Sequence, residues 1–376
     1  MTLYFYNIYD VLKILSNKLH ARIFDTQFLE KQVSLEEETK ISYDIFVKVV
    51  NVKKFFDLLK TIDGEEFIKC EFSTLSLTRK SVAHYQRFLG RFYGLYVEGL
   101  EREKTLVMIT DTLFNFKFSI PLREFLVPED LGYLYLTKLI LKNYYVIHGG
   151  FAKIGSRRIL FIGLPGVGKT TLALDLLAKG AHVFSDDMTI VSSDGIAYGL
   201  PPRRMGLGAI AEKDVRKSLL NFKLLRKFLS KTSYLRWLPY ISLDFIDLLS
   251  VSTERLNQEF PGKIMKGYGK PDYIILINYS SSIDRVIEVP HDALAEKILY
   301  ISMREWYYMD TNPLLLKYAY INENFPLKAV LDKRIEIIKD FIRNSKAITV
   351  EITTKNPREL IEKVLNLIDI KTSYEN

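Results

Sequence analysis

Short apolar runs separated by glycine-containing turns characterise the chain from about residue 145 onward. The runs VIHGGFAKI and RILFIGL are joined by Gly155-Ser156, and the runs MTIVSS and IAYGLP flank Asp194-Gly195. Two apolar runs separated by such a dipeptide predict a β-hairpin. Between the two hairpins the pattern predicts a helix over residues 169–179, ended by Gly180, and then a short strand over residues 182–185.

Further apolar runs predict more strands and helices toward the C-terminus. DYIILINYS is a continuous apolar run of the kind that forms a buried strand, and AITVEIT predicts another strand. VPHDALAEKILYISM predicts a helix. KNPRELIEKVLNLI predicts a helix with Asn356 as its N-cap, Pro357 at its first position and Glu359 in its first turn.

The first 143 residues mix short strands and helices. LFNFKFSI, residues 113–120, alternates phenylalanine with polar residues, which predicts a half-buried strand. We expect it to be the second arm of a hairpin whose first arm is TLVMIT, residues 105–110. PEDLGYLYLTKLILKNYY, residues 128–145, predicts a helix with Pro128 in its first turn.

The length of 376 residues and the change of pattern near Tyr145 together predict two domains. We expect a smaller α+β domain over residues 1–143. An α/β domain with a mixed sheet should follow over residues 144–376, with a basic helical insertion at about residues 203–250. The apolar content of 48%, with 23 Tyr and 23 Phe, is ample for packed cores.

The net charge of +8 is concentrated in one segment. Residues 203–236 hold ten Lys or Arg and two acidic residues, so the rest of the chain is neutral. This argues against a general nucleic-acid-binding surface. Residues 211–232 fit an amphipathic helix, with Leu219 and Phe222 on its apolar stripe. The segment is a candidate lid or docking surface for an acidic partner or for RNA, and the alternative is an ordinary surface helix.

Several classes of protein are disfavoured by what the chain lacks. It has no run of about 18 apolar residues, so we expect no membrane association. The opening MTLYFYNIYD has no basic region before an apolar stretch, so it does not resemble a secretory signal. A single cysteine, Cys70, excludes an intrachain disulfide and disfavours a cysteine-based metal site. We therefore expect a cytoplasmic protein.

The sequence GLPGVGKT, residues 163–170, matches the phosphate-binding (Walker A) pattern G-x-x-x-x-G-K-[ST]. Its glycines let backbone N–H groups curl around an anion, and the following helix adds its positive N-terminal end. We expect ATP to bind here, with Lys169 bridging the β- and γ-phosphates and Thr170 ligating Mg²⁺. The residues expected to contact the nucleotide are Gly163, Pro165, Gly166, Val167, Gly168, Lys169, Thr170 and Thr171.

Two adjacent acids, Asp186 and Asp187, are the candidates for the reaction itself. The chain has neither the N-K-x-D motif of GTPases nor the L-S-G-G-Q motif of ABC proteins, and YIILIN ends in Asn278 where a Walker B acid would stand. If the strand 182–185 neighbours the strand of the phosphate loop, both carboxylates lie beside the γ-phosphate. A kinase needs one carboxylate to accept a hydroxyl proton and another to hold the metal. A water-activating NTPase could use the same pair. Alternatively, the two aspartates have no catalytic role and only begin a turn.

This arrangement resembles the HPr kinase/phosphorylase superfamily, which is more distantly related to phosphoenolpyruvate carboxykinases. The resemblance runs from IHGGFAKI through ILFIGLPGVGKTTLALDLLAKGAHVFSDDMTI to GLPP, and more loosely through PDYIILIN to the C-terminal strand and helix. It implies a P-loop kinase domain of the HPr kinase C-terminal type, preceded by the smaller α+β domain. It also makes a homo-oligomer plausible.

The resemblance implies a role for each residue of the site. Asp186 would be the general base for the acceptor hydroxyl, His148 would lie near it and orient it, and Asp187 would help to bind Mg²⁺. On the residues alone, His148 precedes Gly149-Gly150, where backbone could approach a ligand closely, although a lone histidine is more often structural. The family signature E-x-R-G-L-G is replaced by RRMGLG, so Arg203 stands in the place of the metal-binding Glu. Arg203 and Arg204 are then candidates to contact phosphates or an acidic acceptor, and the alternative is solvated loop charge.

We accordingly expect a kinase that transfers the ATP γ-phosphate to a hydroxyl group, foremost a serine of a protein or peptide. A small-molecule or RNA hydroxyl is the alternative acceptor. A nucleotide-binding regulatory ATPase is the alternative class of protein.

Overall fold

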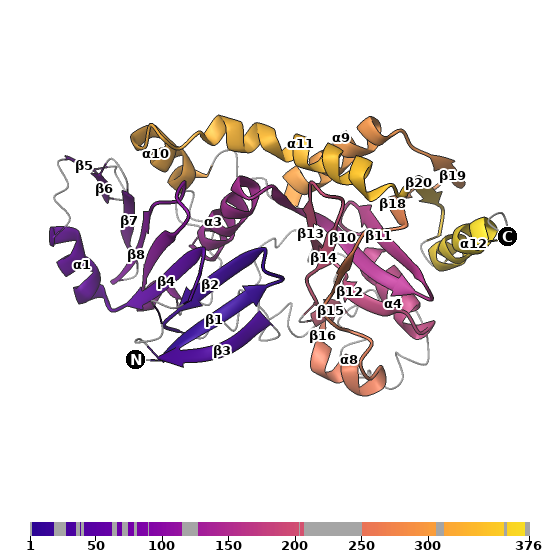
Figure 1. The fold of residues 1–376 in the computed structure, drawn as a ribbon, viewed down its shortest axis with the longest axis horizontal. Coiled ribbons are helices and arrows are strands. Elements are labelled where there is room, and N and C mark those ends of the chain that lie inside the picture. The colour runs from indigo at the N-terminus through magenta and orange to yellow at the C-terminus, as the bar shows by residue number, and fades with distance from the viewer. Residues whose placement is uncertain are drawn as a thin grey trace. The chain divides into compact units, whose positions relative to one another are not determined.

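The computed structural model describes thirteen parts of the chain, which form two compact units (Figure 1). Unit 1 comprises Met1–Tyr144 and Trp306–Arg334, and unit 2 comprises Tyr145–Glu305 and Ile335–Asn376. The division differs from the expected one at 143/144 in that Trp306–Arg334 groups with unit 1. The described residues are 2–18, 28–34, 38, 41–61, 66–69, 74–78, 81–88, 90–114, 127–202, 204–206, 250–305, 312–356 and 359–372.

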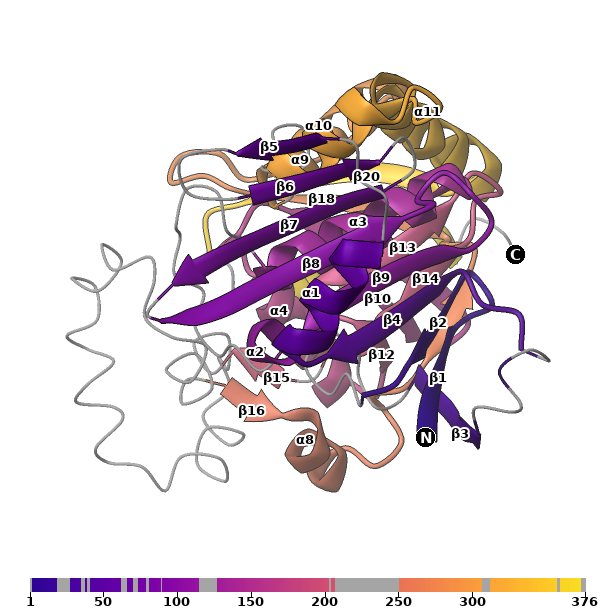
Figure 2. The ribbon, with the colours of Figure 1, turned by 90° about the vertical axis from the view of Figure 1, so that its left-hand side faces the viewer.

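Unit 1 is built on a sheet whose described strands have the order β3-β1-β2-β4-β9-β8-β7-β6-β5 (Figure 2). The pairings β2–β4 and β4–β9 are parallel, and the other pairings are antiparallel. The strands are β1 (Thr2–Ile8), β2 (Leu12–Ser16), β3 (Leu29–Ser34), β4 (Ile45–Val50), β5 (Glu66–Lys69), β6 (Thr74–Thr78), β7 (Ser81–Phe88), β8 (Arg91–Glu98) and β9 (Thr105–Thr110).

The described helices of unit 1 are α1 (Val52–Thr61), α2 (Asp111–Phe114), α3 (Val127–Leu141) and α10 (Pro313–Ile321), and α11 (Leu327–Ser345) begins in it. The apolar stripe of α1 buries Phe55 and Leu59 against the sheet, in one cluster with Tyr96 and Met108. Gly94 makes this approach possible, because a Cβ there would lie 2.6 Å from the Phe55 ring.

The predicted hairpin over residues 105–120 is wrong. β9 ends at Thr110, and α2 begins at Asp111 and includes Phe114. The Asp111 carboxylate accepts a hydrogen bond from the backbone N–H of Thr112 and stands in the first turn, where the helix dipole favours an acid. This stabilisation of the helix start by Asp111 outweighs the strand preference of the alternating phenylalanines. Residues 115–120 lie outside the described residues.

The predicted helix over residues 128–145 is confirmed as α3, but it ends earlier than expected, at Leu141. Asn143 adopts a left-handed conformation with φ 67°, and β10 (Tyr144–Ile154) begins at the next residue. A left-handed residue of this kind typically ends a helix, and asparagine tolerates it better than most residues.

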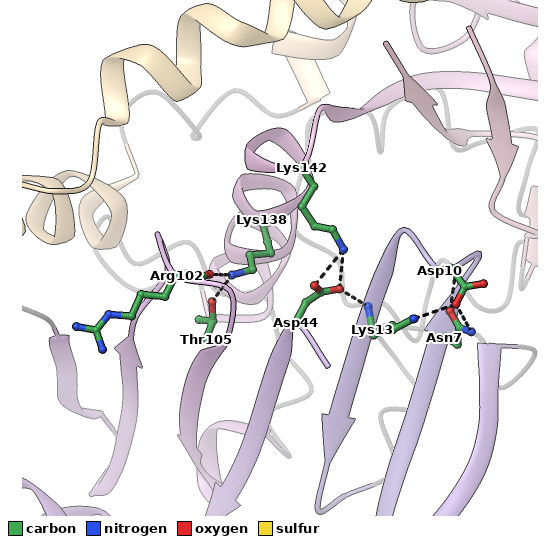
Figure 3. Close-up of polar contacts among 8 residues, drawn as sticks. All are labelled: Asn7, Asp10, Lys13, Asp44, Arg102, Thr105, Lys138 and Lys142. Atoms are coloured by element: carbon green, nitrogen blue, oxygen red, sulfur yellow. Dashed lines mark hydrogen bonds and ion pairs between the residues drawn. The ribbon is translucent and has the colours of Figure 1, made fainter. Parts of the chain in front are cut away.

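A polar cluster joins the sheet of unit 1 to α3 (Figure 3). The Asp44 carboxylate accepts hydrogen bonds from the backbone N–H of Lys13 at 2.8 Å and from the Lys142 amine at 2.9 and 3.0 Å. One helical turn earlier, the Lys138 amine donates to the carbonyl of Arg102 and to the Thr105 hydroxyl. Lys138 is buried, and burial lowers its pKa from 10.5 to about 8.

Substituting Lys138 is expected to change how the stability of unit 1 depends on pH. The folded protein loses the Lys138 proton near pH 8 and the unfolded chain near pH 10.5, so the unfolded chain binds more protons between these values. Stability should therefore rise with pH over this window, by at most about 3 kcal/mol. Lys138→Met should remove the rise, as measured by urea unfolding from pH 7.5 to 10.5. The exposed Lys104→Met controls for the loss of a lysine charge, and a rise that persists in Lys138→Met would contradict the assignment.

Unit 2 is built on a second sheet with the described order β17-β14-β13-β10-β11-β18-β20-β19, and β12 pairs with β10 outside this path (Figure 1). The pairings β11–β18 and β18–β20 are parallel, whereas β10–β11, β10–β12 and β19–β20 are antiparallel. The strands are β10, β11 (Arg157–Gly163), β12 (His182–Ser185), β13 (Met188–Ser192), β14 (Ala197–Gly199), β17 (Gly267–Gly269), β18 (Tyr273–Tyr279), β19 (Arg285–Glu288) and β20 (Ile348–Thr354). The α/β class with a mixed sheet is confirmed.

The helices of unit 2 include α4 (Lys169–Ala178), α8 (Thr253–Glu259), α9 (His291–Glu305) and α12 (Leu360–Thr372). Leu172 and Leu176 of α4 and Val364 of α12 share one core with Phe161 and Ile275 of the parallel strands. This core fixes the strand and the helix on either side of the phosphate loop. The strand pair β15 (Arg204–Gly206) and β16 (Ser250–Ser252) brackets residues 207–249, which lie outside the described residues.

The predicted strands and helices of unit 2 that fall on described residues are confirmed, with small shifts of their ends. Both hairpins form, as β10–β11 and β13–β14, and their turns contain Gly155 and Gly195 with positive φ. The C-terminal helix begins at Leu360, with Asn356 donating a side-chain hydrogen bond to Glu359. The predicted basic helix over residues 211–232 lies outside the described residues. Within the described part of the chain, no helix is both long enough and apolar enough to cross a membrane.

Candidate active site

The phosphate loop connects β11 to α4 and has the backbone that its glycines predict. Gly166 and Gly168 adopt left-handed conformations, with φ 84° and 104°, which other residues rarely adopt. A Cβ on Gly163 would lie 2.7 Å from the Ile277 carbonyl oxygen, so only glycine lets β11 end so close to β18. Leu164, Pro165 and Gly166 are exposed. The loop therefore presents its backbone at the N-terminus of α4, where an anion would bind.

Lys169 lies over this loop. Its amine donates hydrogen bonds to the carbonyl oxygens of Gly163 at 2.7 Å and Leu164 at 3.1 Å, and the residue is buried. A phosphate group on the loop would offer the ammonium a stronger, charge-assisted partner than these neutral carbonyls. The neighbouring Val167, Thr170 and Thr171 are buried or half-buried at the start of α4.

The acidic turn reaches the loop by a route other than the expected one. β12, which leads to Asp186, pairs with β10 and not with the loop strand β11. β10 lies between them, with Gly149 opposite Ile162 of β11 and Phe151 opposite Ser185 of β12. Asp186 nevertheless comes to the loop, because its carboxyl group lies near the Thr170 hydroxyl and the Lys169 ammonium group.

Asp186 has the electrostatic properties of a proton acceptor. It is 6% exposed, and burial, followed by repulsion from Asp187, raises its pKa from 3.8 to about 7. Its own backbone N–H, the Thr170 hydroxyl and the Lys169 charge oppose this rise. A carboxyl group with a pKa near 7 can both take up and release a proton at neutral pH.

Asp187 and His148 form the outer part of the site. Oδ1 of Asp187 lies 3.3 Å from Nδ1 of His148, and the Asp187 side chain is 51% exposed whereas His148 is buried. The histidine expected beside Asp186 thus contacts the neighbouring Asp187. Since about half of the Asp187 side chain is exposed, its carboxylate can bind a cation.

The sequence suggested that the backbone at Gly149-Gly150 could approach a ligand closely. The structure leaves no room for a ligand there. A Cβ on Gly150 would lie 2.2 Å from the Phe161 ring and 3.0 Å from the carbonyl oxygen of Ser185. A Cβ on Gly149 would lie 2.9 Å from the carbonyl oxygen of Phe161. The protein itself fills these positions, so the two glycines serve the close packing of β10 against β11 and β12.

A second pair of glycines seats the strand that leads to Asp186. Gly199 of β14 and Gly267 of β17 are paired across the sheet and lie against Phe184. A Cβ on Gly199 would lie 2.4 Å from the Phe184 Cβ and 2.6 Å from its carbonyl oxygen, so the clash involves backbone that cannot turn away. The position of β12 therefore depends on Gly199.

Gly199→Ala is expected to lower the free energy of unfolding by about 1–3 kcal/mol, because it overpacks this contact. Thermal or urea unfolding measures the change. Gly132→Ala, in α3 with no atom within 4 Å of the added Cβ, is the matched control. The control should be neutral or stabilising by about 0.5–1 kcal/mol, because alanine is the better helix former. A harmless Gly199→Ala would contradict the packing argument.

Magnesium is the cofactor ion expected from the sequence. Among the described residues no three His, Cys, Asp or Glu side chains converge as a protein-only metal site. Mg²⁺ in nucleotide sites usually takes one or two protein oxygens and completes its shell with phosphates and water. The half-exposed Asp187 carboxylate and the Thr170 hydroxyl fit that requirement.

The remaining candidates lie at the margin of the described structure. Arg203 lies outside the described residues, as do most of the basic segment 203–236 and of the insertion at 203–250. Arg204 begins β15, but its side chain is outside the described part. The site as described therefore unites Lys169, Thr170 and Asp186, with Asp187 and His148 beside them.

Three polar residues near the site were not among the candidate site residues expected from the sequence. Asn278, at the Walker B position, lies near the buried Glu351, whose carboxylate pairs with Lys297 at 2.5 Å. Ser185 and Thr189, on either side of the acidic turn, have buried hydroxyls 2.7 Å apart. Only one sequence signal could have indicated the pairing of Ser185 with Thr189, namely that the two residues flank the acidic turn.

Comparison with known proteins gives a distant relative. No family model matches the chain. The chain is 28% identical over 175 residues to the HPr kinase/phosphorylase of Mycoplasmopsis pulmonis (strain UAB CTIP), a match that covers 45% of this chain and 51% of that protein. The chain thus spans about half the length of the curated relative it matches. This similarity supports a distant relation to that kinase/phosphorylase and suggests a kinase-like function.

Proposed function

We propose that unit 2 transfers the γ-phosphate of ATP to a hydroxyl group, and that the acceptor is a serine of a protein or peptide. The observation that carries the proposal is the buried Asp186 carboxyl group, with a pKa of about 7, beside Thr170 and Lys169 of the phosphate loop. A P-loop with a proton acceptor built into its rim suits transfer to an alcohol, whose proton must be removed.

Each residue then has one task. The oxygen of the acceptor hydroxyl bonds to the γ-phosphorus, and Asp186 takes up the proton of that hydroxyl. The bond between that phosphorus and the bridging oxygen breaks, and ADP leaves with the electron pair. Lys169 leaves its loop carbonyls to neutralise the charge on the phosphates. His148 holds Asp187 in place.

Thr170 and Asp187 would hold Mg²⁺ together with the ATP phosphates. The ion supplies positive charge that stabilises the phosphoryl group during transfer. For the protein chain, this leaves two carboxyl groups in different roles, one buried and able to accept a proton, the other half-exposed and beside His148.

The choice of a protein acceptor rests on the relative, whose name designates HPr as what it phosphorylates, and the choice of serine rests on the resemblance described above. The proposal covers the kinase reaction alone, because Arg203 stands where the family that the chain resembles has its metal-binding Glu. The basic segment 203–236 would suit an acidic acceptor surface, and its net charge of +8 also keeps an RNA hydroxyl as the second candidate acceptor.

Labelling distinguishes these acceptors. The full chain is incubated with γ-labelled ATP, Mg²⁺ and an extract of the source cells, and the extract is separated into protein, RNA and metabolite fractions. Label in a protein band that yields phosphoserine on hydrolysis is the expected result. Label in RNA or in a small molecule would replace the acceptor, and label in inorganic phosphate alone would contradict a transferase. Lys169→Ala is the control that should lose labelling in every fraction.

A further inference from the structure

Two buried hydroxyl groups flank the acidic turn that contains Asp186 and Asp187. Ser185 is the last residue of β12 and Thr189 the second residue of β13, and both are fully buried. Their oxygens are 2.7 Å apart, and Oγ1 of Thr189 lies 2.8 Å from the carbonyl oxygen of Gly149. The turn is therefore tied to β10 by side chains that are not its own carboxylates.

The direction of these hydrogen bonds follows from the groups involved. A carbonyl oxygen can only accept, so the Thr189 hydroxyl must donate to Gly149. Thr189 has a single hydroxyl proton, so it can only accept from Ser185. The order is Ser185 to Thr189 to Gly149, and it satisfies both buried hydroxyls.

The carbonyl oxygen that accepts the last of these hydrogen bonds belongs to Gly149, the residue after His148. β10 thus meets the acidic turn at two adjacent residues, through the main chain of Gly149 and through the imidazole, whose Nδ1 lies 3.3 Å from Asp187 Oδ1. Any movement of Thr189 away from Gly149 would also move the turn relative to His148.

Charge repulsion and burial both favour a movement of the acidic turn. Asp186 and Asp187 carry carboxyl groups that repel each other when both are charged, and Asp186 is buried. Turning the carboxylates apart and toward water would relieve both effects. A connection at the base of the turn opposes this relaxation.

We propose that Thr189 is a positioning residue: with Ser185 as its donor, it holds the acidic turn against β10. The turn thereby keeps Asp187 beside His148 and Asp186 beside the phosphate loop. The hydroxyl of Thr189 touches neither carboxylate, so it acts only through the turn and the backbone of Gly149.

The first test needs no activity. The ring ¹⁵N signals of His148 are recorded in the full chain and assigned by their loss in His148→Gln. Thr189→Val, which keeps the shape but removes the hydroxyl, is expected to shift these signals, and Thr189→Ser is expected to restore them. Ser185→Ala, which removes only the outer donor, should shift them in the same direction by less.

Thr349→Val is the matched control. The Thr349 hydroxyl is also buried in the sheet of unit 2 and donates to a backbone carbonyl, that of Val289, at 2.6 Å. Its loss should weaken folding in a similar way but leave the His148 signals in place. His148 signals that are unchanged in Thr189→Val, or equally shifted in Thr349→Val, would overturn the proposal. If Thr189→Val does not fold, Ser185→Ala carries the test.

The second test rests on the proposed function. In Thr189→Val, kcat for phosphoryl transfer should fall about tenfold or more while KM for ATP stays unchanged, because the acid turn moves and the phosphate loop does not. Thr189→Ser should recover kcat, and Thr349→Val should keep it. Equal kcat in wild type and Thr189→Val would overturn the proposal. If the wild type transfers no phosphate at all, the proposed function fails, and the His148 signals still decide the role of Thr189.

Discussion

Replacing Asp186 with asparagine is expected to reduce phosphoryl transfer by about 10²- to 10⁴-fold while leaving ATP binding intact. Asparagine keeps the size of the side chain and remains a polar neighbour of Thr170, but it cannot take up the proton of an attacking hydroxyl. The phosphate loop itself is unchanged, so its contacts with the nucleotide should persist. The loss should therefore appear in kcat and not in the affinity for ATP.

The measurement combines two experiments on the same variant. Label transfer to the acceptor gives the rate, and calorimetry gives the affinity for ATP. Asp194→Asn is the matched control, because Asp194 is exposed in the turn between β13 and β14 of the same sheet. The control should transfer at the wild-type rate. Full activity in Asp186→Asn would exclude Asp186 as the proton acceptor, and parallel loss of ATP binding would make it part of the nucleotide site instead.

The phosphate loop and its flanking elements could be predicted from the sequence because they depend on consecutive residues. Gly166 and Gly168 adopt positive φ where the motif requires glycine, and β11 and α4 follow from uninterrupted apolar patterning. The same holds for the hairpins, whose turns are encoded by the dipeptides between the strands. Local chemistry settles these elements, so an isolated sequence is enough.

The pairing of β12 could not be predicted in this way. It depends on the close approach of β10, which Gly149-Gly150 permit because Phe161 and Ser185 occupy the space of their missing side chains. These contacts join residues far apart in the sequence. The prediction that the acids lie near the loop was right for Asp186, although the strand expected to bring them there was not β11's neighbour.

Tertiary context also decides what a polar residue does. Thr189 stands in the apolar run MTIVSS, where a threonine is an ordinary strand residue, and only the fold brings its hydroxyl to Gly149. Asn278 stands at the end of an apolar run where a Walker B protein has an acid, and the fold brings it near Glu351 on β20. Neither partner is close in the sequence, so patterning alone gives no sign of them.

The same Asp186→Asn substitution is expected to stabilise the protein above pH 7, by up to about 4 kcal/mol. In the unfolded chain this carboxyl group ionises near pH 3.8, but in the folded protein only near pH 7. Between these values the folded state binds more protons than the unfolded state, so the wild type loses stability as pH rises. Asparagine cannot ionise, so the variant escapes the loss.

Urea unfolding of both proteins at pH 4, 5, 6, 7 and 8 measures the effect. The difference between variant and wild type should be smallest at pH 4, grow through pH 5 and 6, and level off above pH 7, because both states of the wild type are then ionised. Asp194→Asn should show no such growth, which removes general charge effects. A difference that is constant with pH would mean that Asp186 ionises alike in the folded and unfolded states, and would remove the electrostatic basis for its role as proton acceptor. A difference that grows as described would show that the site keeps a carboxyl group where asparagine would be more stable, as expected of a residue retained for its chemistry.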